Sequence, residues 1–323
     1  MSPAAGDFER IPVIDIGPPA HNDKGALQRI ADEMREASET AGFFLYVTGH
    51  GIPDQICQRA QQAAATFFAR PEDEKLVSAV DELHRGYVGF GQTKLSSDAR
   101  ADLKESYVWG LELGPDDPDV RARKALMGPN RWPDDVPEFR SALMDFYDAL
   151  SGCARSILCP LAVGIDLPED WFVSRFKKPL ARGAVLRYPP QPPTAPGDQF
   201  GTSAHTDYGG ITLVWQDENG GLEVRNPRGE WVSATPIPVA FVVNVGDLLE
   251  RWTNQHFTSN LHRVTNNSGR ERYSMALFFD PDFDTMIECI ETCAGPDDEP
   301  RYAPVRCGAY IEGRFNNVFE YRK

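Results

Sequence analysis

Apolar side chains in the first third of the chain recur with the period of a helix, interrupted by short apolar runs. Leu27, Ile30 and Met34 fall on one face of a helix predicted over residues 26–41. The run FFLYV that follows predicts a strand, and a second amphipathic pattern begins after the next turn. This pattern predicts that residues 1–120 form a mixed α/β region.

The longest apolar stripe of the chain lies between Asp134 and Ile165. Its apolar residues alternate by three and four from Phe139 to Leu161, and Pro137 stands near the predicted first turn, where a proline is tolerated. A stripe of this kind is a packing surface. We therefore expect this helix to cover one face of a sheet.

From about Arg182 onward the pattern changes to short strand-like runs separated by Gly, Pro and Asn. Among them are GAVLRY, ITLVWQ, FVVNV and RYSMALFF. Many short strands without alternating helices favour a sandwich, barrel or jelly roll. We predict a mainly β fold with flanking helices (α+β), in which residues 121–323 form a helix-backed β region. Together with residues 1–120 it makes one structural unit.

Charge and composition exclude several classes of partner. The 323 residues include 33 Lys and Arg against 48 Asp and Glu, for a formal net charge of -15. Nucleic acids and anionic membranes need a positive surface, so we expect neither as a partner. The sequence also has no apolar run of membrane-spanning length and no secretory signal pattern, which favours a cytoplasmic protein with reduced cysteines.

The segment SAHTDYGG contains two strong metal ligands, His205 and Asp207, one residue apart. If both lie on a strand, they point to the same side and can share one metal ion. The third ligand must come from elsewhere. His262 at the start of another predicted strand is one candidate, and His256 is the alternative.

Two histidines and one carboxylate leave one side of an octahedral metal open, which is typical of non-haem Fe(II) oxygenases. The open side must accept dioxygen and a bidentate ligand. If that ligand is a dicarboxylate such as 2-oxoglutarate, its far carboxylate needs a planar cation and a hydroxyl. Arg272 and Ser274 offer this pair, two residues apart on a predicted strand.

The order His-x-Asp, a distant single His and Arg-x-Ser resembles the iron and 2-oxoglutarate-dependent dioxygenases of the isopenicillin N synthase-like family. The resemblance extends over nearly the whole chain, through AGFFLYVTGHGIP, LKESYVWG and VVNVGDLLERWTN. It implies that residues 121–323 are the catalytic region and that their core is a double-stranded β-helix (jelly roll). It also implies that Fe(II) is held by the residues His205, Asp207 and His262.

The resemblance further implies that Arg272 and Ser274 hold the distal carboxylate of 2-oxoglutarate. Tyr188 matches a tyrosine that assists there in many members. The chain departs from the family at Leu186, where many relatives carry an asparagine.

The implied activity uses 2-oxoglutarate and O2 to hydroxylate, desaturate or cyclise a small organic substrate, with succinate and CO2 as co-products. One alternative is an oxidase of the same fold that does not consume 2-oxoglutarate, like isopenicillin N synthase itself. Another is a jelly roll that binds a metal or ligand without catalysis. The sequence predicts neither the substrate nor the oligomeric state.

Candidate pocket residues follow from their positions beside the predicted metal site. Tyr208, Trp215 and Phe278 are the candidates, together with the C-terminal segment YIEGRFNNVF. Phe278 matches an aromatic that stacks on a flat substrate in a member of the family, and its alternative role is that of a core aromatic.

Overall fold

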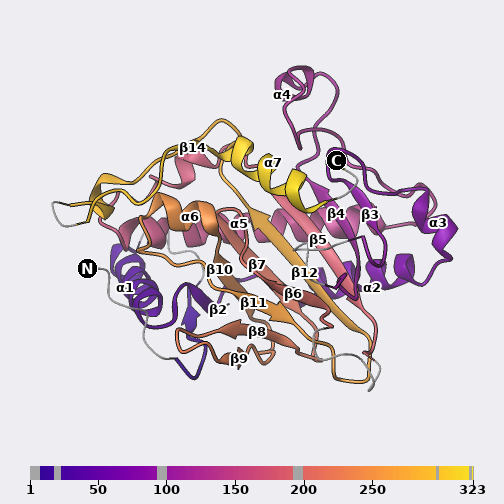
Figure 1. Ribbon diagram of the computed structural model, residues 1–323, viewed down its shortest axis with the longest axis horizontal. Helices are drawn as coiled ribbons and strands as arrows, with labels where there is room; N and C mark the ends of the chain where they lie inside the picture. Colours follow the sequence, from indigo (N-terminus) through magenta and orange to yellow (C-terminus); the bar gives the residue numbers. More distant parts are fainter. Residues whose placement is uncertain are drawn as a thin grey trace.

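A large sheet and a small sheet pack against each other in the computed structural model of the protein (Figure 1). The structure describes residues 8–17, 23–92, 100–191, 199–295, 298–319 and 322. The large sheet has eight strands, in the order β1 (Val13–Asp15), β2 (Phe44–Thr48), β10 (Phe241–Val245), β7 (Ile211–Gln216), β12 (Arg272–Phe279), β5 (Arg182–Tyr188), β4 (Glu105–Gly110) and β3 (Gly86–Val88). The small sheet has four, in the order β6 (Thr202–His205), β11 (His262–Val264), β8 (Leu222–Arg225) and β9 (Trp231–Ser233).

Helices flank the sheets, and a further short strand pair lies near the C-terminal end. The helices are α1 (Lys24–Ala41), α2 (Asp54–Phe68), α3 (Glu72–Leu76), α4 (Pro118–Arg121), α5 (Phe139–Val163), α6 (Asp247–Trp252) and α7 (Cys307–Val318), with 3-10 turns η1 (Val173–Arg175) and η2 (Glu291–Cys293). The short pair is β13 (Met286–Ile287) with β14 (Val305–Arg306). This architecture confirms the prediction of a mainly β fold with flanking helices.

The period of two along β12 separates the main core from the inner face of the large sheet. Met275, Leu277 and Phe279 lie in the main apolar core, which they share with the buried face of α5. Arg272 and Ser274 therefore belong to the opposite face. The helix between residues 134 and 165 thus covers one face of a sheet, as predicted.

That helix begins later than the sequence pattern predicted. Its first residue is Phe139, because Glu138 adopts a left-handed backbone conformation with φ 63° and interrupts the helical path after Pro137. The apolar stripe continues correctly to Leu161. A single left-handed residue is invisible to a periodicity argument, which explains the error.

Strands from before and after residue 120 belong to the same large sheet. β2 pairs with β10, and β4 pairs with β5 along six residue pairs. Helices α1 and α2 pack on α5. All six cysteines are free, as expected for reduced thiols. Among the described residues, no helix combines the length and apolarity needed to cross a membrane.

Candidate active site

The adjacent strands β6 and β11 bring two histidines close together. His205 and His262 are direct cross-strand partners, and their ring centroids lie 4.3 Å apart. The Oδ1 atom of Asp207 lies 3.8 Å from the Nε2 atom of each histidine. One ligand atom from each of the three residues lies within 4.8 Å of the others, which is suitable spacing for one metal ion.

Hydrogen bonds orient all three side chains toward a common point. The Nδ1 atoms of His205 and His262 face the carbonyl oxygens of Ser203 and Asn260, at 2.8 Å and 3.0 Å. If Nδ1 carries the proton and donates there, each Nε2 keeps its lone pair for a metal. This arrangement is the usual support of metal-binding histidines.

The two oxygen atoms of the Asp207 carboxylate have different partners. Its Oδ2 atom accepts hydrogen bonds from Thr212 Oγ1 at 2.6 Å and Asn244 Nδ2 at 2.7 Å. Its Oδ1 atom is the one that faces both histidines. The two donors therefore fix the carboxylate so that one oxygen remains available.

The protonation states of this cluster also suit a metal. Burial, with a smaller contribution from the His262 imidazole, lowers the pKa of His205 to about 4. For Asp207, burial raises the pKa, but the two histidines and the bonds from Asn244 and Thr212 outweigh it, and the pKa is lowered. Both groups are thus held in the deprotonated forms that coordinate metals.

One part of the sequence prediction was wrong in its geometry. His205 is the last residue of β6, but Asp207 lies in the turn beyond it and not on the same strand. The turn is fixed by a hydrogen bond from the Asp247 amide to the Asp207 carbonyl. Gly246 permits this approach, since a Cβ atom there would lie 2.6 Å from the carbonyl oxygen of Gly209. His256, the alternative third ligand, is exposed and is not part of the cluster.

Arg272, the first residue of β12, is buried and has one unused hydrogen-bond donor. It is 1% exposed, and its Nη1 atom has no hydrogen-bond partner. Its Nε donates to the Gly220 carbonyl and its Nη2 to Gln216 Oε1 at 3.3 Å. Among the described residues, no carboxylate forms an ion pair with it. A buried, unpaired guanidinium is costly, so this position suits an anionic ligand.

Tyr188 and Ser274 lie beside Arg272. Tyr188 on β5 is its cross-strand partner, and the Arg272 Cζ atom lies 4.8 Å from the centroid of the Tyr188 ring. Ser274 is two residues further along β12, buried on the same face as Arg272 and opposite Leu186. The predicted Arg-x-Ser pair and the tyrosine therefore come together at one place.

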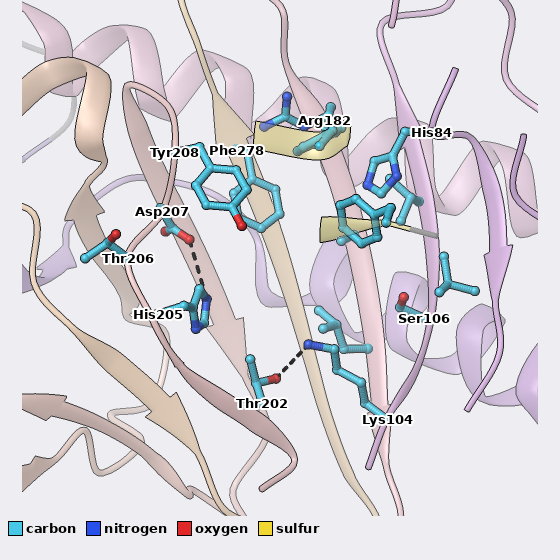
Figure 2. A pocket seen from close by; sticks show the side chains of 16 residues that line it. His84, Lys104, Ser106, Arg182, Thr202, His205, Thr206, Asp207, Tyr208 and Phe278 are labelled. Atoms are coloured by element: carbon cyan, nitrogen blue, oxygen red, sulfur yellow. Dashed lines mark hydrogen bonds and ion pairs between the residues drawn. The ribbon is translucent and has the colours of Figure 1, made fainter. Parts of the chain in front are cut away.

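A cavity of about 130 Å³ opens beside the His-Asp cluster (Figure 2). His205 and Asp207 contribute to its wall, and Phe278, Phe315 and Phe319 supply aromatic surface. A cavity of this size suits a small ring, since an engineered cavity of about 150 Å³ takes up benzene.

The three predicted pocket residues have different outcomes. Tyr208 and Phe278 line the cavity, as Figure 2 shows. Trp215 does not line it, because it lies on the other face of β7 and packs against the main core. On β7 it is Thr212 and Gln216 that face the inner side, where they contact Asp207 and Arg272.

Two relevant cavity residues were missed from the sequence. Arg182, 4% exposed, donates from Nη2 to Asp280 Oδ2 at 2.8 Å, whereas its Nη1 has no partner. Lys104 lies just before β4 and also lines the cavity. The signal was the period of two along the strands. Lys104 shares a face with Ser106 and Val108, and Arg182 shares a face with Ala184 and Leu186, and all six residues line the cavity.

His84 also lines the cavity, and it does not belong to the His-Asp cluster. It is buried among the rings of Phe315 and Phe319. Burial, aided by nearby arginines, lowers its pKa well below the usual value, so the imidazole stays neutral at physiological pH.

Comparison with known proteins identifies the family. Residues 11–135 match the family of N-terminal regions of non-haem dioxygenases in morphine synthesis. Residues 169–281 match the 2OG-Fe(II) oxygenase superfamily. A 2-oxoglutarate-Fe(II) type oxidoreductase of Emericella nidulans is 36% identical over 95% of this chain and 90% of its own length. The chain belongs to the 2-oxoglutarate and Fe(II)-dependent oxygenases.

Other members of this oxygenase family act on different small molecules. A homoarginine-6-hydroxylase of Oryza sativa is 35% identical over 89% of this chain and 90% of its own length. The Neurospora crassa thymine 7-hydroxylase, in complex with 2-oxoglutarate and thymine, superposes with a TM-score of 0.83. That match is 31% identical and covers 94% of this chain and 96% of the other.

Family membership makes Fe(II) and 2-oxoglutarate the cofactors of this oxygenase, with O2 as the oxidant. The described residues fit both. A cluster of two imidazoles and one carboxylate is a donor set that Fe(II) accepts, and it leaves room for further ligands. The partnerless Nη1 of Arg272 suits a carboxylate.

Proposed function

We propose that this oxygenase hydroxylates a small, flat organic molecule that carries a hydrogen-bond acceptor. The observation that carries the proposal is the cavity between the His-Asp cluster and the aromatic wall. The buried guanidinium of Arg182 also lines this cavity, and its Nη1 atom has no hydrogen-bond partner. His205, Asp207 and His262 hold the iron in this proposal. Desaturation and ring closure remain related outcomes, because all three depend on which C–H bond is presented to the metal.

Arg272 and Ser274 hold the distal carboxylate of 2-oxoglutarate in the proposed complex, and Tyr188 assists. When bound, iron and 2-oxoglutarate supply the oxidising chemistry that yields succinate, CO2 and the oxidised product. The protein residues orient these partners. Arg272 fixes the far end of the co-substrate, while the apolar cavity wall keeps water away from the reacting C–H bond.

The cavity favours a flat acceptor over a flexible cation. The Phe278 ring offers a stacking surface, and the free Nη1 of Arg182 offers a donor to a carbonyl or carboxylate oxygen. The carboxylate at that end, Asp280, is occupied by Arg182 and the Gly210 amide. Among the described residues that line the cavity, the only carboxylate is that of Asp207, which the proposal assigns to the metal, so a guanidinium substrate such as homoarginine would find no other acidic partner. The thymine bound by the Neurospora relative is, by contrast, a flat acceptor.

The test of cofactor use is the visible spectrum of the protein with Fe(II) and 2-oxoglutarate in the absence of oxygen. We expect a metal-to-ligand charge-transfer band. Arg272→Ala should lose the band at limiting 2-oxoglutarate, because the anchor of the distal carboxylate is removed. Arg270→Ala is the matched control, since the side chain of that arginine is 64% exposed and its ion-pair partner among the described residues is the exposed Glu218.

The absence of the band would favour the alternative in which the protein does not consume 2-oxoglutarate. Iron binding without a band would place the chain with oxidases of the same fold that do not consume 2-oxoglutarate. If the band forms, succinate release in the presence of flat heterocycles and aromatic acids identifies the substrate. A panel in which only flexible cationic amino acids stimulate succinate release would contradict the proposed substrate class.

A further inference from the structure

A buried lysine forms part of the cavity wall beside the metal cluster. Lys104 is 8% exposed and lines the cavity together with His205 and Leu186. Its Nζ atom lies 2.9 Å from Asp102 Oδ2 and 3.0 Å from Thr202 Oγ1. Figure 2 shows the ammonium turned toward Thr202.

These contacts use two of the three hydrogen-bond donors of the ammonium group. Among the described residues, the third donor has no hydrogen-bond partner. A buried ammonium gains from a further acceptor, because its desolvation is otherwise only partly compensated. The cavity is the space from which such an acceptor can come.

The surroundings of Lys104 connect it to Arg272 on one side. The hydroxyl of Tyr188 lies 3.2 Å from the same Thr202 Oγ1 atom, and the Tyr188 ring faces Arg272. A continuous line of polar groups thus runs from the Arg272 guanidinium through Tyr188 and Thr202 to Lys104.

The surroundings of Lys104 also connect it to the metal cluster. Thr202 begins β6, which ends at His205. Asp102, the partner of Lys104, also accepts hydrogen bonds from the Ser203 amide at 2.9 Å and the Ser203 hydroxyl at 2.7 Å. Lys104 is therefore bound to the strand that spans the distance between the anchor and the metal.

On β5, the residue at this level of the wall is Leu186. Leu186 stands opposite both Ser274 on β12 and Ser106 on β4, and it is apolar. A dicarboxylate held at one end by Arg272 and Ser274 would lie beside Leu186, because Leu186 is the cross-strand partner of Ser274. Its charged or carbonyl oxygens would meet an alkyl side chain on β5 and an ammonium at Lys104.

We propose that Lys104 is a further binding residue for the co-substrate, donating its third hydrogen bond to an oxygen of 2-oxoglutarate. This inference rests on the proposed function, in which Arg272 and Ser274 hold the distal carboxylate. The ammonium supplies the polar contact that Leu186 cannot provide. Asp102 holds the lysine in place and balances its charge when the site is empty.

The test is an anaerobic titration of the Fe(II) protein with 2-oxoglutarate, followed by the charge-transfer band. Lys104→Met keeps the length of the side chain and removes the charge. We expect the apparent Kd for 2-oxoglutarate to rise about ten-fold or more, as for the loss of one charge-assisted hydrogen bond. The Kd for Fe(II), measured without 2-oxoglutarate, should stay unchanged.

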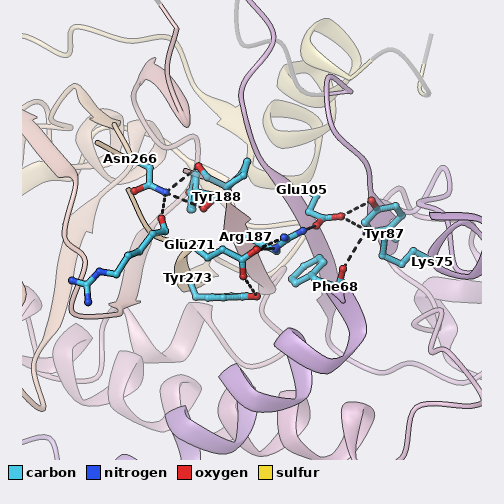
Figure 3. A network of polar contacts seen from close by, with 11 residues as sticks. Phe68, Lys75, Tyr87, Glu105, Arg187, Tyr188, Asn266, Glu271 and Tyr273 are labelled. Carbon is cyan, nitrogen blue, oxygen red and sulfur yellow. Dashed lines mark hydrogen bonds and ion pairs between the residues drawn. The ribbon is translucent and has the colours of Figure 1, made fainter. Parts of the chain in front are cut away.

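A second buried lysine provides the matched control. Lys75 is 7% exposed by its side chain and pairs with the fully buried Glu105 at 2.6 Å, in the network of Figure 3, and it does not line the cavity. Lys75→Met removes a similar buried ion pair and should leave the 2-oxoglutarate titration unchanged. If Lys104→Met does not fold, Lys104→Gln keeps an amide donor for Asp102 and should show the same loss of affinity.

Three outcomes decide the question. A selective loss of 2-oxoglutarate affinity in the Lys104 variants supports the proposal. A titration equal to that of the unchanged protein overturns it, including the case in which only the KM for the oxidised substrate rises. Absence of the band in the unchanged protein overturns the proposed use of 2-oxoglutarate and this inference with it.

Discussion

At the scale of single residues, the carboxylate of Asp207 shows how a metal ligand is prepared before the metal arrives. One of its oxygens is held by Thr212 and Asn244, which are themselves cross-strand partners on β7 and β10. Neither residue belongs to the His-x-Asp motif. Their importance follows only from the sheet register, so sequence reasoning did not find them.

We expect Asn244→Leu and Thr212→Val to weaken Fe(II) binding about ten-fold each, because the loss of a supporting hydrogen bond lets the carboxylate rotate. The affinity can be measured by equilibrium dialysis of the oxygen-free protein. Thr212→Ser keeps the hydroxyl and should bind iron nearly as well as the unchanged protein. Equal affinities for Thr212→Val and Thr212→Ser would show that the hydroxyl does not support the metal.

The buried cations illustrate the same limit of prediction. Arg272 was predicted as a carboxylate-binding residue from a motif. In the structure its Nη1 atom has no hydrogen-bond partner, which suits that role. Lys104 and Arg182 carry the same kind of charge into the cavity without a motif. Lys104 and Arg182 differ from the exposed cations of the chain because they are buried and keep an unused hydrogen-bond donor. Neither property can be predicted from the sequence.

At the scale of elements, the runs with period two predicted the strands of the β-rich half well. The segment RYSMALFF matches β12 in full, and ITLVWQ matches β7. Period two succeeds here because one face of each strand is buried in the main core and the other faces inward. The predictions failed where the backbone leaves a regular element, at Glu138 before α5 and at Asp207 after β6.

The error at Trp215 has the same cause. The turn between β6 and β7 separates Asp207 from the next strand, so the side of β7 that faces the metal could not be inferred by counting from the motif. The structure assigns that side to Thr212 and Gln216. Phe278 was placed correctly because it lies on the same strand as Arg272 and Ser274, an even number of residues away, and therefore on the same face.

The two neighbouring phenylalanines of β12 allow a direct test of this division of faces. Phe278→Ala should raise the KM for the substrate while leaving Fe(II) and 2-oxoglutarate binding intact, because the ring lines the cavity and does not belong to the main core. Phe279→Ala, by contrast, removes a fully buried ring stacked on Phe176 and should lower the free energy of unfolding by about 3–5 kcal/mol. The measurements are steady-state kinetics and urea unfolding of both variants. A loss of iron binding in Phe278→Ala would instead mean that this ring is structural.

At the scale of the whole molecule, the candidate site draws on both sheets. His205 and His262 belong to the small sheet, whereas Arg272 and Ser274 belong to the large one. The N-terminal strands contribute through β4, which follows Lys104 and pairs with β5. The site therefore exists only in the assembled fold, which is why the sequence predicted its ligands but only part of its walls.

A ligand held from both sheets should stabilise the fold only when both ends are engaged. We expect 2-oxoglutarate to raise the Tm of the protein clearly in the presence of Fe(II) and far less in its absence, because its inner end requires the metal. At a concentration of about 100 times Kd the gain corresponds to about 2.7 kcal/mol in the free energy of unfolding. Calorimetry without oxygen, on the unchanged protein and on His262→Ala, provides the measurement. In His262→Ala the metal-dependent part of the shift should disappear, while an equal shift with and without metal would mean that 2-oxoglutarate binds somewhere other than across the two sheets.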